Sequence, residues 1–206
     1  MHEIDVAASD AMLGALALWL GWRTPGVKAA LRTCIRLVMF SVAAGAWLGA
    51  IWHGFLAGEG DAVSMLVWRL TMLAAGLTAY GFAMFGMVAL GSKVRGWTML
   101  FRIMLAGYAL ALVFSDDFRL AIALYVPAVL LALSGFVRRG SMPGIAGMLL
   151  VFVASAYQQW GPDLQAAWLT HNTVYHLLLM PSLLLFRHGA MAIGPAGDHG
   201  LPGRGF

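Results

Sequence analysis

Long apolar blocks alternate with short polar connections along this chain. Most blocks reach the roughly 20 residues that a helix needs to cross a bilayer. None shows the period-2 alternation of a membrane β-strand, so the backbone must satisfy its hydrogen bonds within helices. The pattern predicts an all-α, polytopic membrane protein that forms a bundle of seven transmembrane helices. The expected spans are roughly residues 9–22, 33–56, 63–91, 97–115, 118–136, 143–160 and 168–187.

Charged residues lie mostly in the connections and separate by sign. If the N-terminus is outside, alternate connections facing the cytoplasm hold eleven of the thirteen Lys and Arg residues, from Arg23 to Arg204. The outer side then holds eight of the nine acidic residues. An excess of Lys and Arg in cytoplasmic loops is what orients membrane proteins. We therefore expect the N-terminus out, the C-terminus in, and a bacterial cytoplasmic membrane as the location.

Composition supports the same class of protein. Of the 206 residues, 61% are hydrophobic and 11% are charged, whereas a soluble domain is about a quarter charged. We expect a single transmembrane domain over residues 1–190 and a disordered cytoplasmic tail over residues 191–206, which is rich in Gly and Pro. Because the net charge of +4 comes from the connections, no nucleic-acid partner is expected. The pattern does not address the oligomeric state.

Three histidines lie in the predicted spans near their outer ends. His53 comes late in the second span, and His171 and His176 lie near the start of the last. Ionisable side chains inside a membrane are costly and mark functional sites. Asn172 and His176 are four residues apart and share a helix face, whereas His171 and His176 point about 140° apart. We expect imidazoles of the second and last spans to meet in a pocket beneath the outer face.

These residues resemble the alkaline ceramidase and adiponectin-receptor superfamily, often called CREST. That family has Ser-x-x-x-His on its second helix and His-x-x-x-His on its seventh. His53 and His176 match two of its histidines, whereas Gly49 stands at the serine position and Asn172 at the first histidine of the last motif.

The resemblance implies a zinc-dependent membrane hydrolase of lipid amide or ester bonds. Zinc would be held by His53, His171 and His176. Asn172 and Tyr175 would contact the substrate, and Asp61 or Asp117 would serve as the general base. Membrane lipids are the expected partners.

Other readings remain open at this point. The first is a non-catalytic membrane protein in which the His and Asn cluster fixes helix packing or binds a small ligand. The second is a transporter or proton channel. A haem protein is a further alternative, in which His53 and His176 would be the axial ligands. The absence of a charged residue near the middle of the predicted spans disfavours proton transport.

Overall fold

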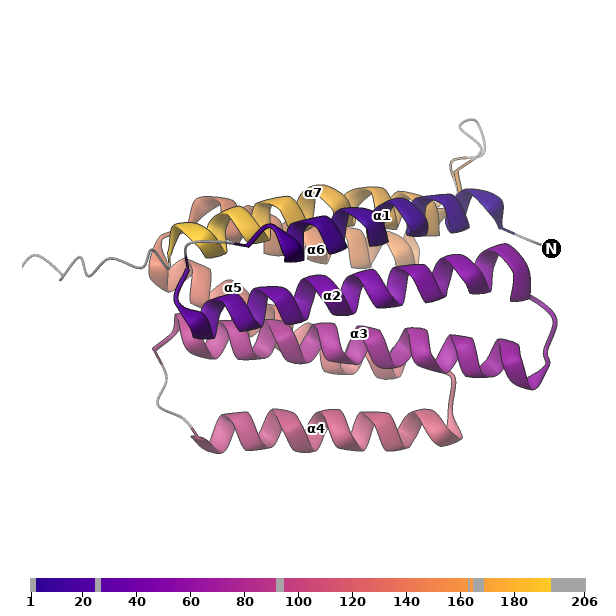
Figure 1. Cartoon of the computed structure of the whole chain (residues 1–206), viewed down its shortest axis with the longest axis horizontal. Helices are drawn as coiled ribbons and strands as arrows, with labels where there is room; N and C mark the ends of the chain where they lie inside the picture. Colours follow the sequence, from indigo (N-terminus) through magenta and orange to yellow (C-terminus); the bar gives the residue numbers. More distant parts are fainter. Residues whose placement is uncertain (1–2, 25–26, 92–94, 163, 165–168, 194–206) are drawn as a thin grey trace, which may run out of the picture.

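The computed structural model describes residues 3–24, 27–91, 95–162, 164 and 169–193. Within these ranges the chain forms seven α-helices and no β-strand, and the helices lie lengthwise beside one another (Figure 1). The prediction of an all-helical bundle is therefore confirmed. The helices are α1 (Ile4–Trp22), α2 (Ala29–Ile51), α3 (Ala62–Ala89), α4 (Arg95–Phe114), α5 (Arg119–Arg139), α6 (Met142–Trp160) and α7 (His171–Ala192). A π-helical segment, η1 (Trp52–Leu56), continues α2.

The helix bounds follow the apolar blocks, with two differences at the chain ends. α1 begins at Ile4, earlier than the expected start near residue 9, and so includes acidic residues that were assigned to the outer loop. α7 continues through Ala192, so the start of the expected tail is helical. The rest of that predicted disordered tail, from residue 194, lies outside the described residues.

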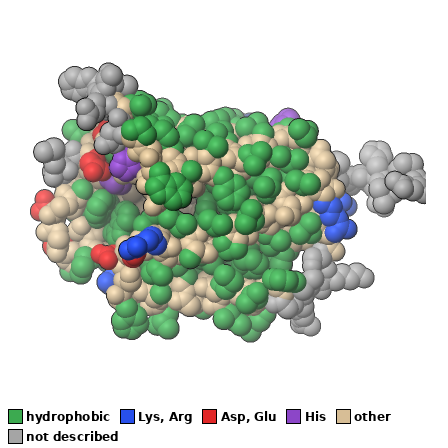
Figure 2. Space-filling view, turned by 180° about the vertical axis from the view of Figure 1, so that it is seen from behind, with side chains coloured by type: hydrophobic (Ala, Val, Ile, Leu, Met, Phe, Trp, Pro, Cys, Tyr) green, Lys and Arg blue, Asp and Glu red, His purple; other side chains and the backbone are tan. Residues whose placement is uncertain are grey.

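Five of the helices are long and apolar enough to cross a membrane: α1, α2 with η1, α3, α4 and α5. The other two helices are α6 and α7. Polar residues lie at the C-terminal end of α6 and the N-terminal end of α7, including Gln158, Gln159 and Asn172. Apolar side chains also cover the body of the molecule between its two ends (Figure 2). These features are compatible with an integral membrane protein.

Six of the helices form a closed ring, and α4 packs outside it. Going round the ring, α1 contacts α2, then α3, α5, α6 and α7, and α7 returns to α1. α4 packs against α3 and, less extensively, against α5 (Figure 1). Much of the α4 surface stays open, as at Leu110 and Phe114, which are 63% and 80% exposed. The space inside the ring therefore belongs to the other six helices.

An aromatic core fills one end of the ring. The ring centroid of Phe186, on α7, lies 5.1 Å from that of Phe82, 5.0 Å from that of Phe85 and 5.7 Å from that of Phe136. All four side chains are essentially inaccessible to solvent. Such edge-on aromatic packing adds about 0.5–1.5 kcal/mol per pair beyond burial. This end of the bundle is sealed by side chains.

Charges gather at the two ends of the bundle. The acidic residues Glu3, Glu59 and Asp116 lie where α1 starts and where α2 and α4 end, on the same side in Figure 1. Figure 2 shows acidic side chains gathered at one end of the molecule and a basic cluster at the other. At the basic end, Arg138 and Arg139 donate hydrogen bonds of 2.6 Å to the backbone carbonyls of Leu90 and Ala89, which stabilises the C-terminus of α3.

Small residues let α6 and α7 approach closely, as is common for helices packed within membranes. A Cβ placed on Gly147 would lie 2.8 Å from the backbone nitrogen of Phe186 and 3.0 Å from the Ser182 carbonyl oxygen. Those atoms belong to the backbone and cannot rotate away. Gly147 therefore sets the distance between α6 and α7.

We expect Gly147→Ala to lower the thermal stability of the purified protein by about 1–3 kcal/mol, because the added methyl group forces the two helices apart. The control is Gly107→Ala on α4, where an added Cβ meets no atom within 4 Å. Thermal unfolding in nanodiscs measures both variants. Equal melting temperatures for the two would contradict the close-contact interpretation.

Candidate functional site

A cavity of about 410 Å³ lies inside the helix ring, and its lining reaches the acidic end of the bundle. All six helices of the ring contribute to its wall, and we call it the central cavity. Its polar and aromatic lining consists of Asp10, Ser41, His53, Trp68, Thr71, Thr78, Phe118, Tyr125, Gln158, Gln159, His171, Asn172, Tyr175 and His176.

The predicted ligand-contacting residues all lie in this lining. His53 comes from η1, and His171, Asn172, Tyr175 and His176 come from the first two turns of α7. Imidazoles of the second and last apolar segments therefore do share one pocket. His171 reaches it because it is the first residue of α7, at the edge of the cavity.

The two predicted general bases lie elsewhere. Asp61 caps the N-terminus of α3, where its carboxylate accepts a 2.7 Å hydrogen bond from the Ser64 backbone N–H. Asp117 forms a 2.9 Å ion pair with Arg119, and the hydrogen bond from that guanidinium holds the pKa of the Asp117 carboxyl below its usual range. Neither residue belongs to the described lining of the central cavity, so neither is placed to act on a molecule bound there.

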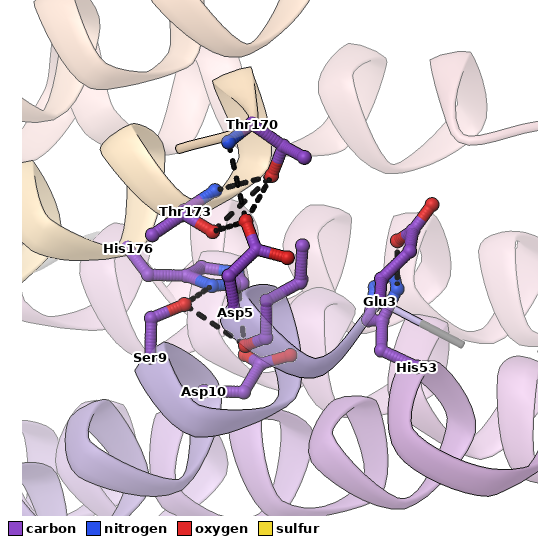
Figure 3. Close-up of polar contacts among 9 residues, drawn as sticks. Glu3, Asp5, Ser9, Asp10, His53, Thr170, Thr173 and His176 are labelled. Carbon is purple, nitrogen blue, oxygen red and sulfur yellow. Dashed lines mark hydrogen bonds and ion pairs between the residues drawn. The ribbon is translucent and has the colours of Figure 1, made fainter. Parts of the chain in front are cut away.

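The polar centre of the site joins the first and last helices. The His176 ring lies between two consecutive residues of α1: Nδ1 is 3.0 Å from the Ser9 hydroxyl, and Nε2 is 3.2 Å from Asp10 Oδ1 (Figure 3). Ser9 and Asp10 are each 4% exposed and His176 is 8% exposed. Both ring nitrogens of His176 are therefore occupied by side chains of α1.

Ser9, His176 and Asp10 have the order of a serine-hydrolase triad, but their placement differs from one. The Ser9 hydroxyl also lies 2.9 Å from the Val6 carbonyl oxygen, and Ser9 does not belong to the lining of the central cavity, whereas Asp10 and His176 do. A nucleophile must reach the substrate. Ser9 therefore orients the imidazole, and Asp10 is the group that meets the cavity.

Asp10 is fitted against a glycine of α2. A Cβ placed on Gly49 would lie 2.7 Å from Asp10 Oδ2, so only glycine leaves room for this carboxylate. Among the described residues, no donor makes a hydrogen bond to Oδ2; the contact of Asp10 with His176 uses Oδ1. Gly49 is the residue that stands at the serine position of the CREST pattern, and here it accommodates an acid from α1.

Two further carboxylates, at the start of α1, bond to residues of η1 and of the N-terminal end of α7 (Figure 3). Glu3 Oε2 lies 2.6 Å from His53 Nδ1. Asp5 Oδ2 accepts hydrogen bonds from the hydroxyls of Thr170 and Thr173 at 3.1 and 2.7 Å. Thr170 is also the N-cap of α7. The acidic N-terminal segment, expected to be an outer tail, therefore connects α1 to η1 and α7.

A second cavity, of about 360 Å³, opens between α5 and α6. Apart from the residues it shares with the central cavity, its wall is almost entirely apolar, with Val129, Val151 and Phe152 among its members. We call it the α5–α6 cleft. The residues common to both walls are Ala75, Phe118, Tyr125, Gln158, Gln159 and Tyr175. The polar and apolar spaces are therefore adjacent.

Comparison with known protein families gives one match, to a family of unknown function, DUF6962, over residues 6–195. The chain belongs to this family. Comparisons with curated proteins and with solved structures found no match. The family match does not connect the chain with the CREST superfamily, so that resemblance stays a prediction.

The arrangement of the histidines does not fit the three-histidine zinc site that the resemblance implies. Zinc binds one nitrogen of each imidazole. Both His176 nitrogens contact side chains of α1, whereas the bond of His53 to Glu3 uses Nδ1 and does not involve Nε2. Within the described part of the chain, no three His, Cys, Asp or Glu side chains are grouped closely enough to hold an ion.

Asp10 is the acid of the central cavity that the sequence did not single out. It was counted among the outer acids because the first apolar segment was expected to begin at about residue 9. A signal was present: Asp10 is flanked by Val6, Ala7, Ala8, Met12 and Leu13, so a helix that begins earlier carries it inside the apolar span. Which side of that helix faced the bundle was not visible in the local pattern.

We expect a double-mutant cycle to show an interaction energy between Asp10 of α1 and His176 of α7. Asp10→Asn and His176→Gln should each lower the free energy of unfolding, and the double variant should lose less than the sum of the two, because they remove one shared contact. Interhelical polar contacts in membranes contribute about 0.6–2 kcal/mol. Thermal or denaturant unfolding in nanodiscs measures the three variants.

The control pair is Asp10→Asn with Thr33→Ala, since Thr33 bonds only to the Ala29 carbonyl of its own helix. That pair should be additive. Additive losses for Asp10→Asn and His176→Gln would mean that the contact does not stabilise the fold.

Proposed function

We propose that this chain is a membrane protein that binds a small amphipathic molecule, with the polar part in the central cavity and the apolar part in the α5–α6 cleft. The observation that carries the proposal is the shared wall of the two spaces, in which Tyr125, Gln158 and Tyr175 border both. A molecule with one polar end and one hydrocarbon end matches this pair of environments.

The sizes support the same class of ligand. Binding sites for small molecules range over about 300–1,000 Å³, and the two spaces measure about 410 and 360 Å³. The cleft reaches the outer surface of the helix ring, where Trp160 is 82% exposed and Val126 is 38% exposed. In a bilayer that surface faces hydrocarbon, so the ligand can enter from the membrane between α5 and α6.

Binding, rather than hydrolysis, is the activity we propose. Among the described residues, the serine that bonds to the His176 ring does not line the central cavity, and both nitrogens of that ring contact side chains of α1. Hydrolysis of a lipid amide or ester remains what the CREST resemblance implies. Lipid binding is common to both functions, and within the described residues none of Ser9, Asp61 and Asp117 lines the central cavity, where a chemical step would take place.

We further propose that all seven helices cross a bacterial cytoplasmic membrane with the N-terminus outside. The basic cluster of Arg23, Arg138 and Arg139 lies at the end of the bundle opposite the acidic connections, as expected for a cytoplasmic face. In this orientation the central cavity lies toward the outer leaflet, and the phenylalanine core closes it on the cytoplasmic side.

Thiol labelling tests the orientation. In a Cys34→Ser background, Glu59→Cys and Asp116→Cys should react with a membrane-impermeant maleimide in intact spheroplasts, because both lie in outer connections. Arg23→Cys should react only after permeabilisation. The native Cys34 is buried and needs to be removed only to exclude background. Labelling of Arg23→Cys in intact spheroplasts would reverse the proposed orientation.

Blocking the cleft tests ligand binding. We use dodecylamine, dodecanol and dodecanoate with the full chain in phosphatidylcholine nanodiscs, and we expect saturable binding of at least one by calorimetry. Ala156→Trp, in the wall of the cleft, should weaken that binding. Each CH₂ group left unburied costs about 0.8 kcal/mol, so displacing two of them weakens binding about tenfold.

The matched control is Val153→Trp on the same helix, because Val153 is 55% exposed and lies outside the described lining of both cavities. It should bind as the wild type does. If none of the three amphiphiles binds, or if Ala156→Trp and Val153→Trp bind equally well, the proposed function is wrong.

A further inference from the structure

One side chain of the central cavity carries an acidic group without a matching cation. Asp10 is buried, lines the cavity and bonds to His176 through Oδ1 only. No Lys or Arg occurs among the described residues of the cavity wall. A carboxylate in a low-dielectric site is costly unless a cation or a proton compensates it. The protein supplies no permanent cation at this place.

The free side of the carboxylate has a defined position. Oδ2 lies against Gly49, where even a methyl group would collide with it. Glycine at this position costs helix stability relative to alanine, and the structure uses the space for the acid. The carboxylate is therefore held at one point in the wall by α2 on one side and by the His176 ring on the other.

Proton positions at the site allow the carboxylate to be either ionised or neutral. If Ser9 donates to Nδ1 of His176, then Nε2–H donates to an ionised Asp10. If Ser9 donates to the Val6 carbonyl, it can accept from Nδ1–H, and a protonated Asp10 can then donate to Nε2. Both arrangements keep the Ser9–His176 and His176–Asp10 contacts, but only the second keeps the hydrogen bond from Ser9 to the Val6 carbonyl, because the hydroxyl has a single proton to donate. A cationic ligand favours the first, since it compensates the charge that a proton otherwise removes.

Aromatic rings complete the recognition of a cation. Trp68, Phe118, Tyr125 and Tyr175 line the same cavity, and the Tyr175 ring lies 5.3 Å from the His176 ring that contacts Asp10. Aromatic faces attract ammonium groups, most strongly where water is excluded. A carboxylate in a cavity that is also lined by several aromatic rings, without a fixed positive charge in the described wall, favours a positively charged ligand.

We propose that the polar end of the bound amphiphile is a protonated amine, which pairs with Asp10 in the central cavity while its hydrocarbon chain occupies the α5–α6 cleft. This inference rests on the proposed function and specifies the class of its ligand. Asp10 supplies the counter-ion, the Oδ2 edge receives an N–H donor, and the aromatic rings surround the ammonium group.

The experiment compares three probes with the same dodecyl tail: dodecylamine, dodecanol and dodecanoate. Binding to the full chain in phosphatidylcholine nanodiscs is measured by calorimetry at neutral pH. Breaking a buried charge pair weakens binding strongly, so wild-type protein should bind dodecylamine at least about tenfold more tightly than dodecanol. Dodecanoate should bind more weakly than either, because its charge repels that of Asp10.

Two variants test the role of the carboxylate. Asp10→Asn keeps the shape and removes the charge, so the preference for dodecylamine over dodecanol should disappear. Gly49→Ala keeps Asp10 and displaces its carboxylate, so it should lower dodecylamine affinity selectively. Gly107→Ala, on α4 with open space around it, should leave all three affinities unchanged.

The possible failures are distinguishable. If wild-type protein binds dodecanol or dodecanoate as tightly as dodecylamine, the amine inference is wrong and the proposed binding of an amphiphile still holds. If dodecylamine is preferred but Asp10→Asn and Gly49→Ala retain the preference, Asp10 is not its partner. If no probe binds the wild type, the proposed function itself fails. The wild-type comparison needs no variant, so a variant that does not fold leaves the test intact.

Discussion

The His176 ring between Ser9 and Asp10 is the contact on which the rest of the structure depends. In a bilayer, buried polar groups must find partners within the protein. The hydroxyl and one carboxylate oxygen each contact a nitrogen of the imidazole, and in doing so they join the first helix to the last. That junction closes the ring of six helices, because α1 and α7 have no short connection along the chain.

Closing the ring creates an interior with two different ends. Toward the basic end, Phe82, Phe85, Phe136 and Phe186 fill the space between the helices. Toward the acidic end, polar and aromatic side chains line an open cavity. α4 stays outside the ring and contributes to neither. The division places the polar site near one end of the bundle and leaves the opposite end tightly packed.

The same histidines that suggested a metal site have other partners here. His53 is bonded to Glu3 through Nδ1, and the two nitrogens of His176 contact Ser9 and Asp10, so residues near the N-terminus contact both histidines. The resemblance to a metal-dependent hydrolase depended on residue spacing in α2 and α7 alone. The acids near the N-terminus occupy contacts of these histidines that the residue spacing alone did not reveal.

The amino-acid sequence alone determined the helices and the separation of charge. Runs of apolar residues long enough to cross a bilayer have one stable backbone conformation there, and Lys and Arg collect at one end of the bundle, so these features are local properties that can be read residue by residue. The same reading placed His53 and His176 in one pocket. The role of Asp10 was decided by the tertiary structure, since an acid two turns into a helix can face water, lipid or the bundle. Only the packing of α1 against Gly49 of α2 and His176 of α7 turned it inward, and those three residues are far apart in the chain.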